Sequence, residues 1–372
     1  IADANSNQNA SPPGVPQQMV APDYGLEWRL RPWDNVGDAP NPYSDYEDQL
    51  SADFNTFMSA HNNRHQVGPG RPPNGLLTAQ MFLQENFNSV SYIPQNATFY
   101  ANTSDGCQRI ITLNQSDQDP PSRYLDEVLV IDMCALQGDK VLVLSGQQLG
   151  IFRSPGSNNG RLYNMPAPAS DREMVGLHRV SCIWRDNWPK YAVTDLSGAV
   201  CFWCPTYRCW EDEICVYTLA GYDTLPTSFA FNMCVTDKSD NDTRNTIMYF
   251  TLYYQGEVFA YDDDTKQILW HNHFACHHPA GITSTPDKLL VCEALESSPC
   301  VVVLGHNGAL LQKVMQNYIE GPCWGIVSSS ESLIQQQHEI DSDAITVAVW
   351  HQSNNSDMYV DVFHLNTLLA SG

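Results

Sequence analysis

The sequence predicts an all-β fold, a six-bladed β-propeller, and three observations support this class. Short strand-like runs rich in β-branched and aromatic residues recur along the chain, as in Val141–Leu144. Most of these runs follow a polar turn, and the turns recur with a period of roughly 40–60 residues, the length of a propeller blade. Such a turn occurs six times, at Gly106, Gly146, Gly198, Gly256, Gly308 and Asp357.

The N-terminal part of the chain is expected to lie outside the blades. Residues 1–45 are rich in Pro, Asn, Ser and Gly, which predicts an arm over the surface or a disordered arm. Within it, residues 26–31 alternate apolar and polar side chains, and we expect this strand to close the ring by pairing with the last blade. Residues 45–61 predict a short amphipathic helix, with apolar residues four positions apart at Leu50, Phe54 and Met58.

The propeller itself is expected over residues 46–366, followed by a short tail, 367–372. Each blade reads as an antiparallel meander of short strands joined by tight turns. The six blades are expected at about 77–115, 124–165, 178–218, 226–275, 280–316 and 322–366.

Charge, cysteine content and sequons indicate the setting of the protein. The chain has 19 basic and 42 acidic residues, a formal net charge of −23, which disfavours nucleic acid and anionic membranes as partners. No apolar stretch approaches the ~18 residues that a membrane span needs. Without a charged-then-apolar leader, the chain is expected to be a mature, secreted product. Twelve cysteines and the sequons at Asn9, Asn96, Asn102, Asn114, Asn241 and Asn354 agree with an extracellular glycoprotein.

Several segments resemble one family of propellers. Val130-Ile-Asp-Met-Cys134 with Val141–Gly146, then Tyr191–Trp203, Gly321–Trp324 and Ile345–His351, follow the order and spacing of motifs in the yellow and major royal jelly proteins. The resemblance covers roughly residues 75–366. It implies a secreted six-bladed propeller. Members are mostly nonenzymatic binders of small amines or lipids, or proteins of pigment pathways.

Aromatic residues near the expected propeller axis predict the ligand site. Innermost strands line the channel of a propeller, and an aromatic cup with a few polar groups suits a planar apolar or cationic ligand. For each of these aromatic residues a place in the core is the alternative. The predicted ligand-binding residues are Trp184, Phe231, Asn232, Thr283, Trp324, Trp350 and His351.

Other clusters offer weaker candidates for chemistry. Four imidazoles within eight positions, His271, His273, His277 and His278, are the candidates for a metal, against a loop with solvated histidines. The acidic run Asp262–Asp264 offers oxygens for calcium, against a solvated hairpin tip. Cysteines are expected to pair as disulfides, with Cys134 and Cys182 as candidates for a bridge between neighbouring blades.

The sequence therefore favours a secreted binding protein that carries a small apolar or aromatic ligand in the channel. A pigment, amine, sterol or carotenoid is compatible. It assigns no catalytic residue, no metal and no cofactor other than this bound ligand, and it leaves homo-oligomer formation open. A propeller enzyme, an isomerase, hydrolase or oxygen-using enzyme with a scattered channel site, is one alternative. A structural or coat protein that acts through its faces is the other.

Overall fold

The computed structural model of the chain describes a large set of strands and their connections. The arm 1–45, with its expected strand 26–31, and the expected helix 45–61 lie outside the described residues. The described residues are 77–83, 87–110, 123–126, 128–136, 140–146, 148–153, 161–164, 177–185, 188–195, 198–207, 209–221, 231–240, 243–253, 255–294, 299–316, 318–319, 321–331, 344–352 and 358–371.

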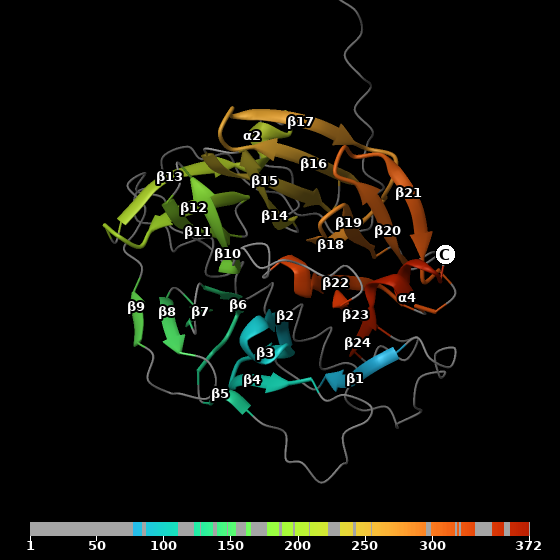
Figure 1. Cartoon of the computed structure of the whole chain (residues 1–372), viewed down its shortest axis with the longest axis horizontal. Coiled ribbons are helices and arrows are strands. Elements are labelled where there is room, and N and C mark those ends of the chain that lie inside the picture. Colours follow the sequence, from blue (N-terminus) through green and yellow to red (C-terminus); the bar gives the residue numbers. More distant parts are fainter. Residues whose placement is uncertain are drawn as a thin grey trace, which may run out of the picture.

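Six four-stranded antiparallel sheets lie around a common centre, so the fold is a six-bladed β-propeller (Figure 1). The first three blades, each from its innermost strand outward, are β2 (Phe87–Ile93), β3 (Thr98–Thr103), β4 (Gly106–Arg109) and β5 (Arg123–Asp126); β6 (Asp132–Ala135), β7 (Lys140–Ser145), β8 (Gln148–Arg153) and β9 (Arg161–Asn164); and β10 (Leu177–Arg185), β11 (Trp188–Asp195), β12 (Ala199–Cys204) and β13 (Cys209–Cys215).

The other three blades follow the same order. They are β14 (Phe231–Asp240), β15 (Thr243–Leu252), β16 (Glu257–Asp262) and β17 (Gln267–Asn272); β18 (Pro279–Ser284), β19 (Lys288–Glu293), β20 (Cys300–Gly305) and β21 (Leu310–Val314); and β22 (Cys323–Ser328), β23 (Thr346–Gln352), β24 (Met358–His364) and β1 (Leu77–Leu83). Short helical segments include η1 (Pro94–Asn96), α2 (Val216–Leu219) and α4 (Leu365–Leu369), and residues 329–331, after β22, are helical too.

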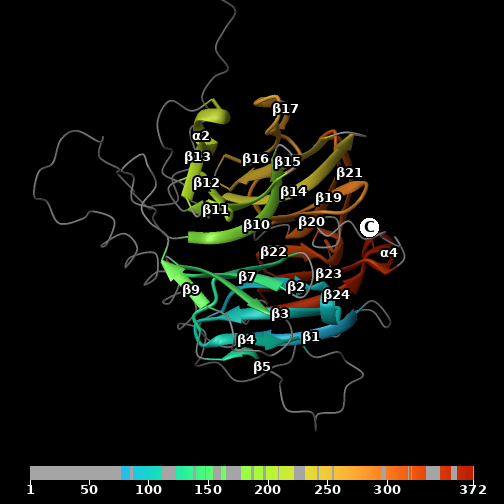
Figure 2. The same cartoon turned by 60° about the vertical axis from the view of Figure 1, so that its left-hand side comes forward.

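The ring is closed by β1, which lies beside β24 in both views (Figure 2). Gln80 pairs with Asp361 in an antiparallel register, so the first described strand is the outer edge of the last blade. The expected first blade, 77–115, is therefore wrong at its start, because Leu77–Leu83 belongs to the sixth blade and the first blade begins at Phe87. Pairing with a chain end removes the open edge that the last blade would otherwise present.

The turn glycines explain why the repeat was visible in the sequence. Gly106, Gly146, Gly198 and Gly256 begin or precede the third strand of their blades, and all have positive φ. Glycine adopts such a backbone without the steric cost that a Cβ would add. Gly308 has positive φ too, but it lies one turn later, between the third and fourth strands of the fifth blade.

The hydrophobic core lies between the blades rather than along the axis. The buried apolar residues form six clusters, and each cluster takes its members from two neighbouring blades. Successive side chains of a strand point to opposite faces of its sheet, so one strand contributes to the two clusters on either side. In β10, for example, Cys182 faces the second blade and Ile183 faces the fourth.

The two sides of the ring differ in which strand ends they carry. We call the side where the innermost strands begin the N-face, and the side where they end the C-face. Glycines let the inner strands of the fifth and sixth blades approach closely, because a Cβ at Gly281 would collide with the backbone of Gly325. The fifth and sixth blades are therefore in backbone contact near the N-face.

Candidate functional site

A buried polar network occupies the described part of the central channel. Arg179 on β10 donates from Nη1 to Asn232 Oδ1 at 2.9 Å, and its Nη2 lies 3.5 Å from Glu331 Oε1. Glu331 Oε2 accepts from the Thr283 hydroxyl at 2.7 Å. Asp132, at the start of β6, accepts the Val180 N–H at 3.0 Å. Side chains from several blades therefore meet across the axis through charge-assisted hydrogen bonds.

This network determines what the channel can hold. The cavity beside Arg179, Asp132 and Glu331 has a volume of about 30 Å³, enough for one or two water molecules. Burial raises the pKa of Asp132 and of Glu331, while the Arg179 guanidinium opposes the rise. The predicted ligand residues Asn232 and Thr283 do lie at the channel, but they bind Arg179 and Glu331. An apolar ligand does not fit in this cavity.

Trp350 and His351 belong to the core. Trp350 is 7% exposed, lies in the cluster between the sixth and first blades, and meets Phe87 edge to face at 6.1 Å. His351 Nε2 lies 2.9 Å from Asp361 Oδ2, which also accepts from the Tyr318 hydroxyl. Both residues are on β23, an inner-middle strand whose two faces are covered by neighbouring blades. Their prediction as ligand residues is wrong for this reason.

The remaining predicted residues lie on opposite sides of the ring. Trp324 is half-buried at the N-face, where its ring stacks on Tyr253 at 6.2 Å and Nε1 donates to Gln352 Oε1 at 3.3 Å. Trp184 lies near the C-face end of β10. Phe231 begins β14, and its side chain lies outside the described residues. The predicted aromatic cup therefore does not form, because its members are distributed among the channel, the core and both faces.

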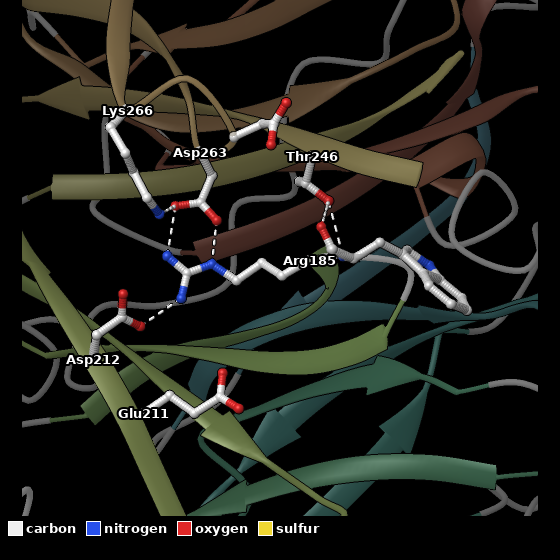
Figure 3. A pocket seen from close by; sticks show the side chains of 8 residues that line it. Arg185, Glu211, Asp212, Thr246, Asp263 and Lys266 are labelled. Carbon is white, nitrogen blue, oxygen red and sulfur yellow. Dashed lines mark hydrogen bonds and ion pairs between the residues drawn. The ribbon is translucent and has the colours of Figure 1, made fainter. Parts of the chain in front are cut away.

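A larger pocket opens at the C-face between the third and fourth blades (Figure 3). Its volume is about 390 Å³. The third blade contributes the end of β10 and the start of β13, and the fourth contributes the start of β15 and the turn between β16 and β17. The pocket is lined by Trp184, Arg185, Glu211, Asp212, Thr246, Asp263, Asp264 and Lys266.

Arg185 organises this pocket. Its Nε and Nη2 donate to the two carboxylate oxygens of Asp263 in the next blade, and its Nη1 donates to Asp212. The guanidinium carbon lies 3.8 Å from the centre of the Phe202 ring, a cation–π contact that holds the guanidinium plane. A bidentate Arg–carboxylate pair sets geometry as well as charge, so the two blades are held in one arrangement at the pocket.

The turn between β16 and β17 places the carboxylates. Asp262 Oδ1 accepts the N–H of Asp264 at 3.0 Å, so this acidic run lies at a hairpin tip as expected. The tip is not fully solvated, because Asp262 and Asp263 are buried and only Asp264 is exposed. Lys266 Nζ donates to Asp263 Oδ1 at 2.8 Å. Burial alone would raise the pKa of Asp263, but hydrogen bonds and charges from Arg185 and Lys266 lower it below its ordinary value. Asp263 is therefore a carboxylate at neutral pH.

The lining of this pocket, here called the C-face pocket, is acidic. Four acidic and two basic side chains line it, and Lys190, outside the lining, pairs with Glu211, so the lining together with this partner has a formal net charge of −1. Asp263 is neutralised by Arg185 and Lys266, whereas Asp264 is exposed at the hairpin tip. Sequence reasoning missed the pocket, because Arg185 and Asp263 are 78 positions apart. The run Asp262–Asp264 was the available signal.

The histidine candidates do not converge on one point. His273 Nδ1 lies 3.1 Å from Glu257 Oε1, and the rings of His271 and His273 are 5.0 Å apart. The backbone N–H groups of His277 and His278 donate to the Glu293 carboxylate instead. Within the described part of the chain, no group of three or more His, Cys, Asp or Glu side chains is arranged to hold a metal ion.

The cysteines and sequons also have defined environments. None of the twelve cysteines is in a disulfide in this structure, so the expected Cys134–Cys182 bridge is not formed. Asn102 is completely buried, and its amide nitrogen donates to the hydroxyls of Ser89 and Ser91, both at 2.8 Å. A glycan has no space there, so the prediction for Asn102 is wrong. The other sequon side chains, including Asn96 at the end of η1, lie outside the described residues.

The known proteins that are similar to this chain are similar only remotely. No protein-family model matches the chain, and no curated protein matches it. The solved structures that are similar include the following three. BBS1N in complex with ARL6DN is 9% identical, covers 79% of this chain and 98% of that chain, and has a TM-score of 0.47. The luciferin-regenerating enzyme is 12% identical, with coverage of 78% and 96% and a TM-score of 0.48. The Neurospora crassa Pan2 WD40 domain is 9% identical, with coverage of 75% and 89% and a TM-score of 0.43.

The class of this protein is therefore the β-propeller, with six blades defined by its own sheets. Among the described residues, no helix is both long and apolar enough to span a membrane.

Proposed function

We propose that this propeller is a secreted binding protein whose ligand is a small organic cation, an amine, held in the C-face pocket. The observation that supports this proposal is a pocket of about 390 Å³ lined by four carboxylates, with a formal net charge of −1 when Lys190, the partner of Glu211, is counted. This volume lies within the ~300–1,000 Å³ that small-molecule sites occupy. Of the ligand classes that the sequence suggested, only an amine suits a lining dominated by carboxylates.

Three of the four carboxylates that line the pocket have a basic partner. Asp263 binds Arg185 and Lys266, Asp212 also binds Arg185, and Glu211 binds Lys190. Asp264 is exposed on the hairpin tip beside Asp263, and we infer that it contacts the ammonium group of the ligand. The pocket is open to solvent, so screening by salt weakens this attraction, and we expect Kd values in the micromolar to millimolar range.

Secretion remains part of the proposal. It is supported by the sequons other than Asn102 and by the resemblance to the yellow and major royal jelly proteins. A chain with a formal net charge of −23 also attracts cations at long range, which increases the rate at which an amine reaches the pocket.

A matched pair of probes tests the ligand class. Isothermal titration of the full chain with tryptamine and with indole-3-acetate compares two ligands that share an indole and differ in the sign of their charge. We expect tryptamine to bind, with an affinity that falls as salt is raised, and indole-3-acetate to bind much more weakly. Equal binding of the two probes, or no binding of either, refutes the proposal.

Two aspartate variants locate the binding site. Asp264→Asn removes one exposed charge at the pocket and should raise the Kd for tryptamine about threefold. Asp287→Asn is the matched control, because Asp287 is an exposed aspartate next to β19 in the fifth blade that pairs with Lys288. It should leave the Kd unchanged. If both variants have the same effect, the ligand responds to the overall charge of the protein and not to this pocket.

A further inference from the structure

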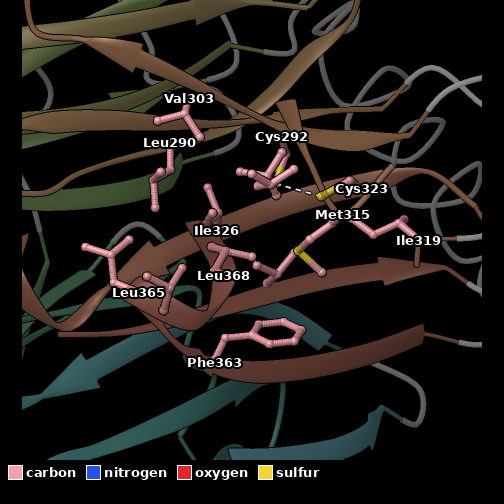
Figure 4. Packing of buried hydrophobic residues seen from close by; sticks show 14 of the residues in the cluster. Leu290, Cys292, Val303, Met315, Ile319, Cys323, Ile326, Phe363, Leu365 and Leu368 are labelled. Atoms are coloured by element: carbon pink, nitrogen blue, oxygen red, sulfur yellow. Dashed lines mark hydrogen bonds between the residues drawn. The ribbon is translucent and has the colours of Figure 1, made fainter. Parts of the chain in front are cut away.

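Two buried cysteines of neighbouring blades lie in contact. Cys292 is on β19 of the fifth blade, and Cys323 begins β22 of the sixth. Their Sγ atoms are 2.8 Å apart, and both residues are completely buried. They belong to the cluster that fills the space between these two blades, together with Met315, Ile326 and Phe363 (Figure 4).

This contact is too close for two separate thiols. Non-bonded heavy atoms pack best at ~3.5–4.0 Å, and a covalent sulfur–sulfur bond is ~2.05 Å. A shift of less than an ångström therefore joins the two sulfurs, whereas keeping them as thiols requires that they move apart in a densely packed core. We propose that Cys292 and Cys323 form a disulfide that links the fifth and sixth blades.

The environment of the other candidate pair is different. Cys134 and Cys182 lie on the innermost strands of neighbouring blades, but the Cys134 thiol contacts the backbone of Cys182. Cys107 donates its thiol hydrogen to the Met133 sulfur at 3.6 Å. Cys292 and Cys323 are thus a thiol pair whose sulfur atoms already contact each other.

The position of this bond has a consequence for ring closure. The sixth blade is assembled from both ends of the described chain, because β1 pairs with β24. A bond between β19 and β22 attaches the innermost strand of that blade to the fifth blade, independently of β1. The sixth blade is then linked to the fifth blade by a covalent bond, and the pairing of β1 with β24 completes the sixth blade itself.

The bond forms by thiol–disulfide exchange with an external disulfide such as oxidised glutathione. The thiolate of one cysteine attacks a sulfur of the reagent and releases one glutathione thiolate; the second cysteine thiolate then attacks the mixed disulfide and releases the other. The cysteine pair is oxidised, the reagent is reduced to two thiols, and these take up the two protons. Because burial raises the pKa of Cys292 well above its ordinary value, we expect the exchange to occur during folding, before the two blades pack together.

Mass spectrometry tests the bond in the unmodified chain. The full chain is refolded with oxidised and reduced glutathione, its free thiols are alkylated in denaturant, and it is digested without reductant. We expect a linked peptide that contains Cys292 and Cys323, two hydrogens lighter than its two separate peptides and lost on reduction. Alkylation of both cysteines, or linkage of either one to another cysteine such as Cys300, refutes the proposal.

Thermal unfolding provides a second readout. The bond closes a loop between residues 31 positions apart, and its reduction should lower the Tm by about 5 °C. Cys292→Ala should abolish this difference between oxidised and reduced samples. Cys107→Ala, the matched removal of a buried thiol, should keep it. Should Cys292→Ala fail to fold, Cys323→Ala serves the same purpose, and the mass measurement requires no variant.

Discussion

Trp350 packs directly over Gly325 of the neighbouring strand, and this contact yields the sharpest prediction on stability. A Cβ added at Gly325 would overlap the Cζ2 and Cε2 atoms of the Trp350 indole. Trp350→Ala empties the space that the indole fills, and Gly325→Ala pushes the indole out of it. Each single variant should therefore be strongly destabilised.

The magnitude follows from burial. Trp350 is 7% exposed. A buried tryptophan removes ~200 Å² from water, which at ~25 cal/mol per Å² corresponds to roughly 5 kcal/mol, an upper estimate. Truncations of buried tryptophan cost about 3–5 kcal/mol, and we expect this loss for Trp350→Ala. Gly325→Ala should cost a similar amount, because it displaces the same ring.

The double variant distinguishes this mechanism from two independent losses. When the indole is absent, the new methyl group of Ala at position 325 enters the vacated space, so Gly325→Ala/Trp350→Ala should be only about as unstable as Trp350→Ala alone. The coupling free energy should be at least about 2 kcal/mol.

Urea unfolding followed by circular dichroism gives the four free energies, and Trp188→Ala is the matched control. Trp188 is 61% exposed, so its removal should change stability by no more than about 1 kcal/mol. Additive losses in the double variant, or a stable Gly325→Ala protein, would refute the packing argument.

Three further variants test the other environments. Arg185→Met leaves the buried Asp263 carboxylate without its guanidinium and should cost about 3–5 kcal/mol of folding free energy in urea unfolding, whereas a loss below about 1 kcal/mol would mean that solvent replaces the pair. The pKa of Asp263 is lowered in the folded state, so its ionised carboxylate stabilises the fold above its ordinary pKa of 3.8, and this stabilisation is lost as the pH falls through the folded pKa. The difference in unfolding free energy between wild type and Asp263→Asn should therefore shrink below about pH 4. A difference that stays constant with pH contradicts this. Peptide mapping should find no glycan on Asn102, and an occupied site would contradict its burial. Trp324→Ala should destabilise by only about 1–2 kcal/mol, less than Trp350→Ala, because Trp324 is half-buried at the N-face.

The sequence alone predicted the class of fold and the number of blades. Strand periodicity and turn glycines such as Gly146 and Gly198 are local properties, since each depends on the backbone of a few adjacent residues. The hairpin tip at Asp262–Asp264 was predicted for the same reason, because its hydrogen bonds join residues two or three positions apart.

Pairing between distant strands decided which strand closes the ring, and the sequence alone did not predict this. Alternating patterns occur at 26–31 and 77–83, and only the register of Gln80 with Asp361 shows that Leu77–Leu83 is the outer strand of the last blade. A pattern of apolar residues specifies that a strand has a buried face, but it does not specify which distant strand covers that face.

Contacts between distant strands also decide which of the predicted site residues lie in the core and which lie at a surface. Trp350 and Trp324 look alike in sequence, but Trp350 is enclosed between the sixth and first blades while Trp324 stacks on Tyr253 at the N-face. Arg185 and Asp263 come from different blades and meet only when the ring is assembled. Contacts between blades decide which tryptophan lies in the core, where the acidic pocket opens and which cysteines touch. These contacts join residues that no local sequence pattern connects.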